Sequence, residues 1–426
     1  MNCEKLNQDI AELQTLRDRF ARKVDELNDS MRGKIETRKI QEEVQSLEDQ
    51  ILGSYLVEFK EKNPELFRWH LGEKIDGFGG TADYSNFISS IAQLPNGEGM
   101  LVGGAIGTLY VCCKDKDGKW KLEEKINGFE DASGDIYEIT SIAQLPNGEG
   151  MLVGGGNGVL YVCRKGEDGK WKLEEKIDGF ESNGSARNVE SIASLPDKEG
   201  MLVGGEWGKL YVCRKGEDGK WKLGEKVDGF VDTEGHSCDI YSIASLPDKE
   251  GMLVGGDYGT LHVCRKGKDG IWRLGEEIKG LYTAVHSIAQ LPDGEGMLVG
   301  GELGDLYVCR KGEDGKWKLE EKIEKFENRS VYSIAPLPDG EGMLVGGELG
   351  DLYVCRKDED GRWKPEERIG FKDIRGKTIA SVAQLPNGDG MLVGGIRGAL
   401  HEVSRPDLSV DTIKQNLDSI IQKGAV

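Results

Sequence analysis

The sequence is poor in several residue types, and each scarcity argues against a class of protein. Among 426 residues there are only 11 prolines and 5 histidines, and aromatic residues make up 7%. The 56 basic residues are outnumbered by 76 acidic ones, which gives a formal net charge of −20. A net negative charge disfavours binding to nucleic acid and to anionic membranes, because basic patches drive both kinds of binding.

Long apolar runs are also missing. No stretch approaches the roughly 18 consecutive apolar residues of a membrane-spanning helix. The first residues, MNCEKLNQDIAELQ, lack the basic and then apolar segments of a secretory signal peptide. We therefore expect no membrane insertion and a cytoplasmic location.

Nine cysteines are present, yet their spacing argues against a disulfide scaffold. Equivalent positions in neighbouring repeats lie a whole unit apart, beyond the ~7 Å between Cα atoms that a disulfide can bridge. We expect these side chains to be small buried apolar groups in a reducing compartment. Six cysteines occupy the same place in successive repeats: Cys112, Cys163, Cys213, Cys264, Cys309 and Cys355.

Glycine, in contrast, is abundant, with 62 residues, and much of it belongs to a repeated phrase. MLVGG occurs seven times, at intervals of 45 to 51 residues. A full unit, residues 191–227, reads SIASLPDKEGMLVGGEWGKLYVCRKGEDGKWKLGEKV. It contains four strand-sized segments separated by glycine-rich hairpin turns. Four antiparallel strands in each unit of this length are typical of a β-propeller blade, whereas the parallel strands of a solenoid would not be joined by short hairpins.

The number of strands predicts how the ring closes. Both the MLVGG strand and the Trp-x-Leu-x-Glu strand, whose last copy has Pro365 in place of leucine, occur seven times, but out of phase. The chain enters with a fourth strand, RWHLGEKI (68–75), and leaves after a third strand, ALHEVSR (399–405). One incomplete blade at each end makes one complete blade, so we predict an all-β, seven-bladed propeller closed by pairing of N-terminal and C-terminal strands.

The ends of the chain have helical patterns. Residues 1–66 carry two heptad-spaced apolar seams that Gly33 separates, and 405–426 carries apolar residues at helical spacing. We expect a helical hairpin or coiled coil over 1–66, the propeller over 67–404, and a C-terminal helix over 405–426 that packs on the N-terminal helices. An intramolecular hairpin and a dimerising or docking coiled coil both fit the first segment.

The repeats also resemble known propeller families. LYVCRKGEDGKWKLEEKI (160–177) is similar to the Asp-box hairpin of sialidase-type blades, although the usual serine is absent. MLVGG-x-x-G-x-LY resembles a strand pair in the propellers of bacterial sensor proteins, and the ring closure resembles that of WD-repeat proteins. The resemblance covers about 340 residues and implies a propeller fold and no single family.

Variation among the repeats is confined to one face of the predicted ring. In a propeller, the turns between second and third strands and the connections from fourth to first strands share one face. Both segments vary here, while the turns of the other face are nearly constant. Exposed apolar groups beside acids are suited to binding a protein. The candidate partner-binding residues are Ile106, Asn157, Glu206, Trp207, Asp257, Tyr258, Glu302, Leu303, Glu348, Leu349 and Arg397.

Motifs that suggest chemistry have simpler explanations. The glycine-rich turns precede strands and not the helix that a phosphate loop opens. DKDG and DEDG lack the remaining ligands of a calcium loop, and no two histidines have metal-ligand spacing. We therefore expect no cofactor, no metal and no catalytic residues, and a non-enzymatic protein-recognition or scaffold module. The alternatives are a multivalent carbohydrate-binding lectin and a sialidase-like enzyme, which the absence of an arginine cluster disfavours.

Overall fold

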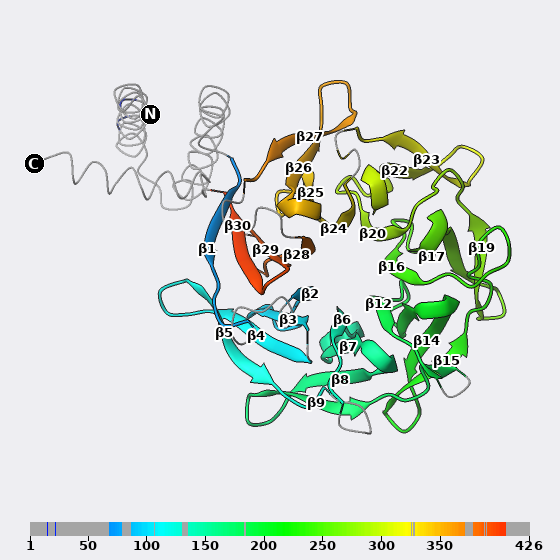
Figure 1. Ribbon diagram of the computed structural model, residues 1–426, viewed down its shortest axis with the longest axis horizontal. Coiled ribbons are helices and arrows are strands. Elements are labelled where there is room, and N and C mark those ends of the chain that lie inside the picture. Colours follow the sequence, from blue (N-terminus) through cyan, green and yellow to red (C-terminus); the bar gives the residue numbers. More distant parts are fainter. Residues whose placement is uncertain are drawn as a thin grey trace, which may run out of the picture. The chain divides into compact units, whose positions relative to one another are not determined.

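Seven four-stranded antiparallel sheets surround a central axis, as the sequence predicted (Figure 1). His70–Ser404 forms one compact unit. The predicted helices of 1–66 and 405–426 lie almost entirely outside the part of the chain that the structure, a computed structural model, describes. The described residues are 68–405 without 79–86, 106, 130–134, 183–184, 325, 327–328, 371–377, 387 and 389, and also Thr15 and Arg22.

Six sheets, here called blades 1 to 6, each consist of four strands in chain order. Blade 1 has β2 (Ile88–Gln93), β3 (Met100–Gly104), β4 (Thr108–Lys114) and β5 (Trp120–Ile126). Blade 2 has β6 (Ile139–Gln144), β7 (Met151–Gly155), β8 (Leu160–Lys165) and β9 (Trp171–Lys176). Blade 3 has β12 (Val189–Ser194), β13 (Met201–Gly205), β14 (Lys209–Lys215) and β15 (Trp221–Lys226).

The next three blades repeat this order. Blade 4 has β16 (Ile240–Ser245), β17 (Gly251–Gly256), β18 (Leu261–Lys266) and β19 (Trp272–Glu277). Blade 5 has β20 (Val285–Gln290), β21 (Gly296–Gly301), β22 (Leu306–Lys311) and β23 (Trp317–Lys322). Blade 6 has β24 (Val331–Pro336), β25 (Gly342–Gly347), β26 (Leu352–Lys357) and β27 (Trp363–Arg368).

Blade 7 closes the ring by joining the two ends of the repeat region. Its strands are β28 (Ile379–Gln384), β29 (Gly390–Gly395), β30 (Ala399–Ser404) and β1 (His70–Lys74). β1 pairs antiparallel with β30, with His70 opposite Ser404 and Leu71 opposite Val403. The predicted closure is confirmed, and this pairing completes the seventh four-stranded blade.

Short elements occur only in connections. β10 (Glu181–Ser182) and β11 (Ser185–Ala186) form a small hairpin between blades 2 and 3. A 3₁₀ turn, η2 (Pro146–Gly148), joins β6 to β7. Five further 3₁₀ turns join the second and third strands of blades 2 to 6: η3 (Gly156–Gly158), η4 (Glu206–Gly208), η5 (Asp257–Gly259), η6 (Glu302–Gly304) and η7 (Glu348–Gly350).

A closed belt of serine hydroxyls links the innermost strands, a feature that the sequence analysis did not single out. In each blade the serine of the first strand accepts a hydrogen bond from a backbone N–H in the first strand of the next blade. Ser242 accepts from Ile288 at 2.9 Å, for example, and Ser381 of blade 7 accepts from Ile91 of blade 1 at 3.0 Å. The other acceptors are Ser90, Ser141, Ser191, Ser287 and Ser333. These bonds satisfy buried amides that the strand ladders leave free.

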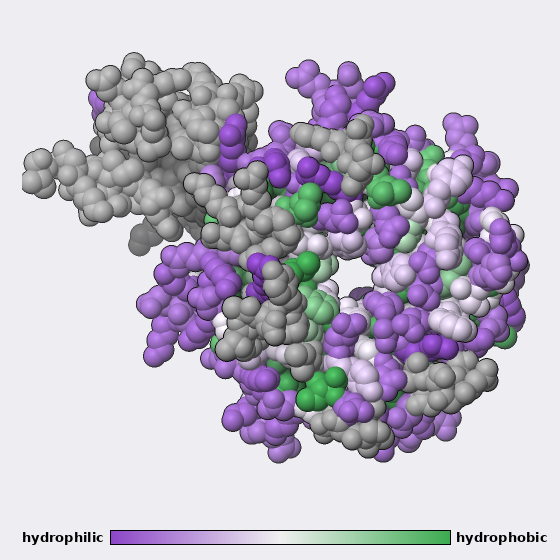
Figure 2. All heavy atoms as spheres, in the orientation of Figure 1, coloured by the Kyte–Doolittle hydropathy of each residue, from purple (hydrophilic) through white to green (hydrophobic). Residues whose placement is uncertain are grey.

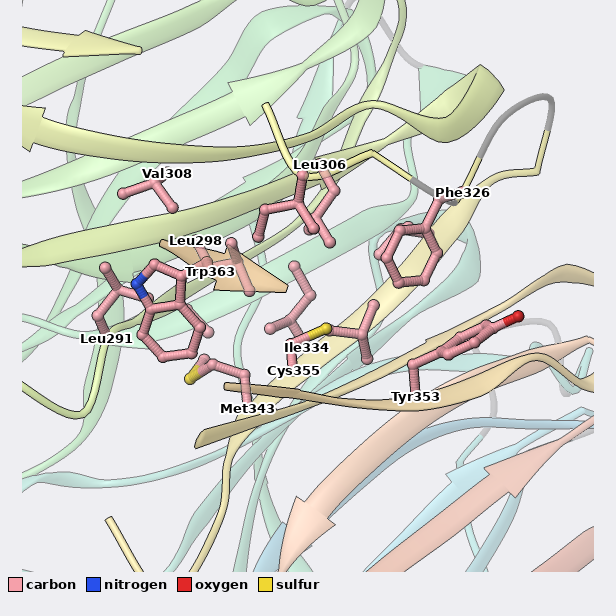
Figure 3. Close-up of a cluster of buried hydrophobic side chains, with 14 residues drawn as sticks. Leu291, Leu298, Leu306, Val308, Phe326, Ile334, Met343, Tyr353, Cys355 and Trp363 are labelled. Atoms are coloured by element: carbon pink, nitrogen blue, oxygen red, sulfur yellow. The ribbon is translucent and has the colours of Figure 1, made fainter. Parts of the chain in front are cut away.

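The apolar core lies between neighbouring blades. Figure 3 shows the cluster between blades 5 and 6, where Leu298 and Leu306 from one blade pack among Met343, Cys355 and Trp363 from the next. The same combination recurs at other junctions in the described ring. The repeated tryptophan, methionine and cysteine therefore bury their side chains against the preceding blade.

The repeated cysteines are buried and free, as expected from their spacing. Burial raises the pKa of the Cys163 thiol to about 12. A thiol with so high a pKa carries almost no thiolate at neutral pH, which is the reactive form. These side chains therefore serve as small apolar groups in the core.

Candidate partner-binding face

The two variable segments of the sequence are packed against each other. In the turn after β13, the N–H of Gly208 donates to the carbonyl of Cys238, in the connection from β15 to β16, at 2.7 Å. The N–H of Glu206 donates to the carbonyl of Asn188, in the preceding connection, at 3.2 Å. We call the surface formed by these turns and connections the variable face. Ile106 lies outside the described residues, while the other candidate residues all lie in these turns.

The second variable residue of each described turn has a left-handed backbone. The φ angle is 57° at Asn157, 59° at Trp207, 53° at Tyr258, 52° at Leu303 and 57° at Leu349. Arg397 has a φ of 61° in the equivalent turn of blade 7. Glycine and asparagine adopt this conformation readily, whereas other residues lose about 1–2 kcal/mol. The conformation of the turn favours a residue such as Asn157. It does not explain the bulky Trp207, Tyr258, Leu303 and Leu349, which the left-handed backbone disfavours.

Four of these strained positions carry large apolar groups that face solvent. Trp207, Tyr258, Leu303 and Leu349 are between 52% and 70% exposed. Figure 2 shows one face of the ring with an open centre, on which apolar side chains form small separate patches among polar ones. Neither burial nor backbone preference accounts for these four side chains.

Side chains of the fourth-to-first connections hold these turns in place. The backbone N–H of Trp207 donates to Asp239 Oδ1 at 2.7 Å, and that of Asn157 donates to Asn188 Oδ1 at 3.0 Å. The Arg187 guanidinium carbon lies 4.0 Å from the centroid of the Trp207 ring. Cation–π contacts of this kind orient an exposed aromatic ring. These contacts hold the backbone of the turns, and the ring of Trp207, in defined positions.

A row of variable residues on the inner strands lies beside the turns, and the sequence analysis missed it. The residue before the belt serine is Glu190, Tyr241, His286 and Tyr332 in blades 3 to 6. The His286 ring lies 5.1 Å from that of Tyr241 and 5.0 Å from that of Tyr332, centroid to centroid. All four residues are half-buried. The large chemical differences at this position, in a strand whose other positions change little, were the signal available in the sequence.

Each acid of the variable turns faces this inner row. His286 Nε2 lies 3.5 Å from Glu302 Oε1, and the Tyr332 hydroxyl donates to Glu348 Oε1 at 3.3 Å. Burial, followed by the negative charge of Asp257 and a hydrogen bond to it, raises the pKa of Tyr241. Burial lowers the pKa of His286, although Glu302 opposes this effect. The acids and the aromatic row form one connected surface.

Crowding of carboxylates is greatest at Glu190. Burial, and then the charges of Glu138 and Glu206, raise its pKa to about 7. Burial also raises the pKa of Glu138. Burial is the larger cause, and the neighbouring carboxylates add to it, so Glu190 lies in a partly buried group of acidic side chains.

A groove opens beside Tyr258 at the outer part of the variable face. It has a volume of about 570 Å³, and its walls include Asp232, Glu234, His236 and Tyr282. Tyr282 is the most exposed large hydrophobic side chain of the described ring, at 87%. His236 Nδ1 lies 3.2 Å from Asp232 Oδ2. Tyr258 and Tyr282 both line this groove.

The opposite face is constant because its side chains pair with one another. Lysines at the ends of third strands reach the first-to-second turn of the preceding blade. The distance is 2.8 Å for Lys215 Nζ to Glu149 Oε2 and 3.0 Å for Lys266 Nζ to Asp197 Oδ2. Further pairs are Lys165 with Glu98, Lys311 with Asp248 and Lys357 with Asp293. Each exposed pair contributes little alone, but a change in either residue affects two blades.

The described residues also include no group of three or more histidine, cysteine or acidic side chains suited to a metal ion. Within the same part of the chain, no helix has the length and apolar character required to cross a membrane.

We predict that Leu303→Asn raises the stability of the propeller by about 0.5–1 kcal/mol. Asparagine tolerates the left-handed backbone, and the exposed leucine loses little burial. Urea unfolding of the variant and the parent measures the difference. The reverse change, Asn157→Leu, should lower stability by a similar amount. A loss of stability in Leu303→Asn would mean that Leu303 packs within the molecule.

Comparison with known proteins places the fold. The sequence matches no protein-family model and no curated protein. The structure is similar to the crystal structure of the WD40 β-propeller domain of Doa1, with a TM-score of 0.59. The match covers 80% of this chain and 98% of that domain, at 16% sequence identity. The chain therefore has the fold of a seven-bladed β-propeller with four-stranded antiparallel blades, similar to a WD40 domain.

Proposed function

We propose that this protein is a non-enzymatic recognition or scaffold module that binds a partner protein through the variable face. Exposed aromatic and aliphatic side chains on a rigid support are typical anchors of protein interfaces. The variable turns provide them on adjacent blades, at Trp207, Tyr258, Leu303 and Leu349. We further propose that the segments 1–66 and 405–426 are helical and oligomerise the protein or dock it to a larger assembly.

The observation that carries this proposal is the placement of large apolar residues at left-handed, exposed positions. A turn under selection for stability alone favours glycine or asparagine there. Residues that reduce stability without a packing role are characteristic of binding and active sites. On the opposite face, the described non-glycine residues with a left-handed backbone are Lys198 and Lys249, which are polar and not apolar.

The lectin alternative requires similar pockets in several blades. The second variable residue instead differs between the neighbouring blades 2, 3 and 4, where it is Asn157, Trp207 and Tyr258. A single asymmetric surface suits one protein partner better than several identical sugars. The sialidase-like alternative requires a cluster of arginines free to hold a substrate, whereas the described Arg329 and Arg368 both pair with Asp351.

The proposal is tested by affinity capture from cell lysate with two baits. One is the intact protein, and the other carries Trp207→Ala, Tyr258→Ala, Leu303→Ala and Leu349→Ala. We expect a partner that the intact protein captures to be lost from the variant, since truncation of central anchors typically costs about 2 kcal/mol each or more. Quantitative mass spectrometry of the captured proteins measures the loss.

A matched control comes from the opposite face. Ile271 is exposed and apolar, and lysine occupies its place in several other blades, for example at Lys170 and Lys220. Ile271→Lys should leave the captured proteins unchanged. Equal capture by the intact protein and the four-residue variant would contradict a binding role for the variable face.

A further inference from the structure

The variable face is not uniform, and blades 3 to 6 differ from the rest. In these four adjacent blades, the turn between the second and third strands has an acid followed by an apolar residue. The acids are Glu206, Asp257, Glu302 and Glu348, and the apolar residues are Trp207, Tyr258, Leu303 and Leu349. We call these turns, with the inner residues Glu190, Tyr241, His286 and Tyr332, the acidic arc.

The acidic and apolar side chains of the acidic arc occupy different positions relative to the inner row. The acids lie against the inner row, as the contacts of Glu302 with His286 and of Glu348 with Tyr332 show. The apolar side chains that follow the acids are exposed to solvent. A ligand on this surface therefore meets aromatic rings and carboxylates toward the centre and apolar groups beside them.

The other blades lack these groups at the equivalent positions. The inner residues there are Ala380, Ser89 and Thr140 in blades 7, 1 and 2, and no acid stands in their turns. Blade 2 has Gly156 and Asn157 instead. Negative charge on the variable turns is thus concentrated on one side of the ring.

Three basic side chains near the acidic arc pair with acids that do not belong to the arc. Lys322 Nζ lies 3.2 Å from Asp305 Oδ1, and Arg368 lies 2.8 Å from Asp351 Oδ1. Arg329 also pairs with Asp351. These three cations are therefore paired with Asp305 and Asp351 and not with the turn carboxylates.

The chain provides one example of how this surface holds a cation. The Arg187 guanidinium lies over the Trp207 ring, with its carbon 4.0 Å from the ring centroid. Tyr241, His286 and Tyr332 present aromatic rings beside carboxylates in the neighbouring blades. Arginine binds both kinds of group, through its planar face and its five N–H donors.

We propose that the acidic arc binds a partner-protein segment that combines arginine or lysine with apolar side chains. The basic groups contact the carboxylates and aromatic rings of the inner side, and the apolar groups contact Trp207, Tyr258, Leu303 and Leu349. This inference rests on the proposed function and names the chemistry of its partner. Charge complementarity selects this occupant, because an acidic or neutral segment would leave the crowded carboxylates uncompensated.

The test uses a displayed library of random peptides selected on the intact protein. We expect the enriched peptides to carry net positive charge together with leucine or aromatic residues, and to bind more weakly as salt rises. In a variant with Glu206→Gln, Asp257→Asn, Glu302→Gln and Glu348→Gln, their affinity should fall by about tenfold or more. The amides keep the shape of the side chains and their capacity to accept hydrogen bonds.

A control variant removes the same number of charges from the opposite face. Its changes are Glu167→Gln, Glu217→Gln, Glu313→Gln and Glu359→Gln, all at exposed turn positions. Binding should change by less than about twofold, since these charges lie far from the peptide relative to the screening length. A similar loss in both variants would show a general charge effect and overturn the inference.

Other outcomes are also decisive. Enrichment of neutral or acidic peptides, or no enrichment, would overturn the inference. If the four-residue apolar variant loses the peptides while the amide variant keeps them, the variable face binds but the predicted partner chemistry is wrong. If both variants keep them, the proposed function and this inference fail together.

Discussion

Gly256→Ala is expected to destabilise the propeller by about 3 kcal/mol, although it adds a single methyl group. A Cβ atom at Gly256 would lie 1.8 Å from the carbonyl oxygen of Asp239 and 2.8 Å from Cε1 of Phe230. That carbonyl accepts a hydrogen bond from the N–H of Asp257 at 3.0 Å, so it cannot move away without losing this bond. Thermal or urea unfolding of the purified variant measures the loss.

Gly224→Ala is the matched control for that experiment. Its Cβ would have only Val212 O nearby, at an ordinary contact distance of 3.5 Å, and glutamate stands at this position in other blades. We expect stability within about 0.5 kcal/mol of the parent. Equal stability of Gly256→Ala and Gly224→Ala would contradict the close approach of β16 and β17. It would also remove the steric reason for the constant glycine pair that ends MLVGG.

Trp317→Ala is expected to cost about 4 kcal/mol, the usual range for truncation of a buried aromatic residue. Trp317 is 3% exposed and belongs to the cluster between blades 4 and 5, which includes Leu246, Met297 and Cys309. Its removal leaves a cavity between two sheets that the serine belt and the neighbouring blades hold at a fixed separation. Chemical denaturation, followed by the fluorescence of the remaining tryptophans, gives the change in free energy.

Two further variants serve as controls for Trp317→Ala, and both should be less destabilising. Trp317→Phe keeps most of the buried ring and should cost less than Trp317→Ala. Trp207→Ala removes the same residue type at a position that is 58% exposed, and we expect a change of about 0.5 kcal/mol. If Trp317→Ala were as mild as Trp207→Ala, the junction between blades 4 and 5 would not depend on the repeated tryptophan.

These stability predictions and the binding proposal concern different parts of each repeat. The constant residues form the junctions between blades, the serine belt and the ion pairs of the opposite face. A framework with so many repeated contacts tolerates a small loss at each variable turn. The left-handed backbone at Trp207, Tyr258, Leu303 and Leu349 lowers the free energy of unfolding in this way. We propose that these residues are kept because they bind the partner.

Much of this architecture could be read from the sequence because the repeat makes local signals redundant. Seven copies of MLVGG and seven of the tryptophan strand, out of phase, predicted the number of blades and their closure, and the pairing of β1 with β30 confirms both. Alternation of apolar and polar residues identified the strands, and equivalent spacing identified the cysteines as buried and unpaired. The sorting of variation between two faces followed from the order of strands alone.

Only the tertiary structure decided how residues of different repeats meet. The serine belt joins residues such as Ser90 and Ile142, which are 52 positions apart, and no local pattern indicates that bond. The left-handed backbone of the variable turns depends on the connection packed beside them, which supplies acceptors such as Asp239. The aromatic row of Tyr241, His286 and Tyr332 exists because successive inner strands stand side by side around the axis. A repeat sequence specifies each blade, but the closed ring determines which side chains of neighbouring blades share a surface.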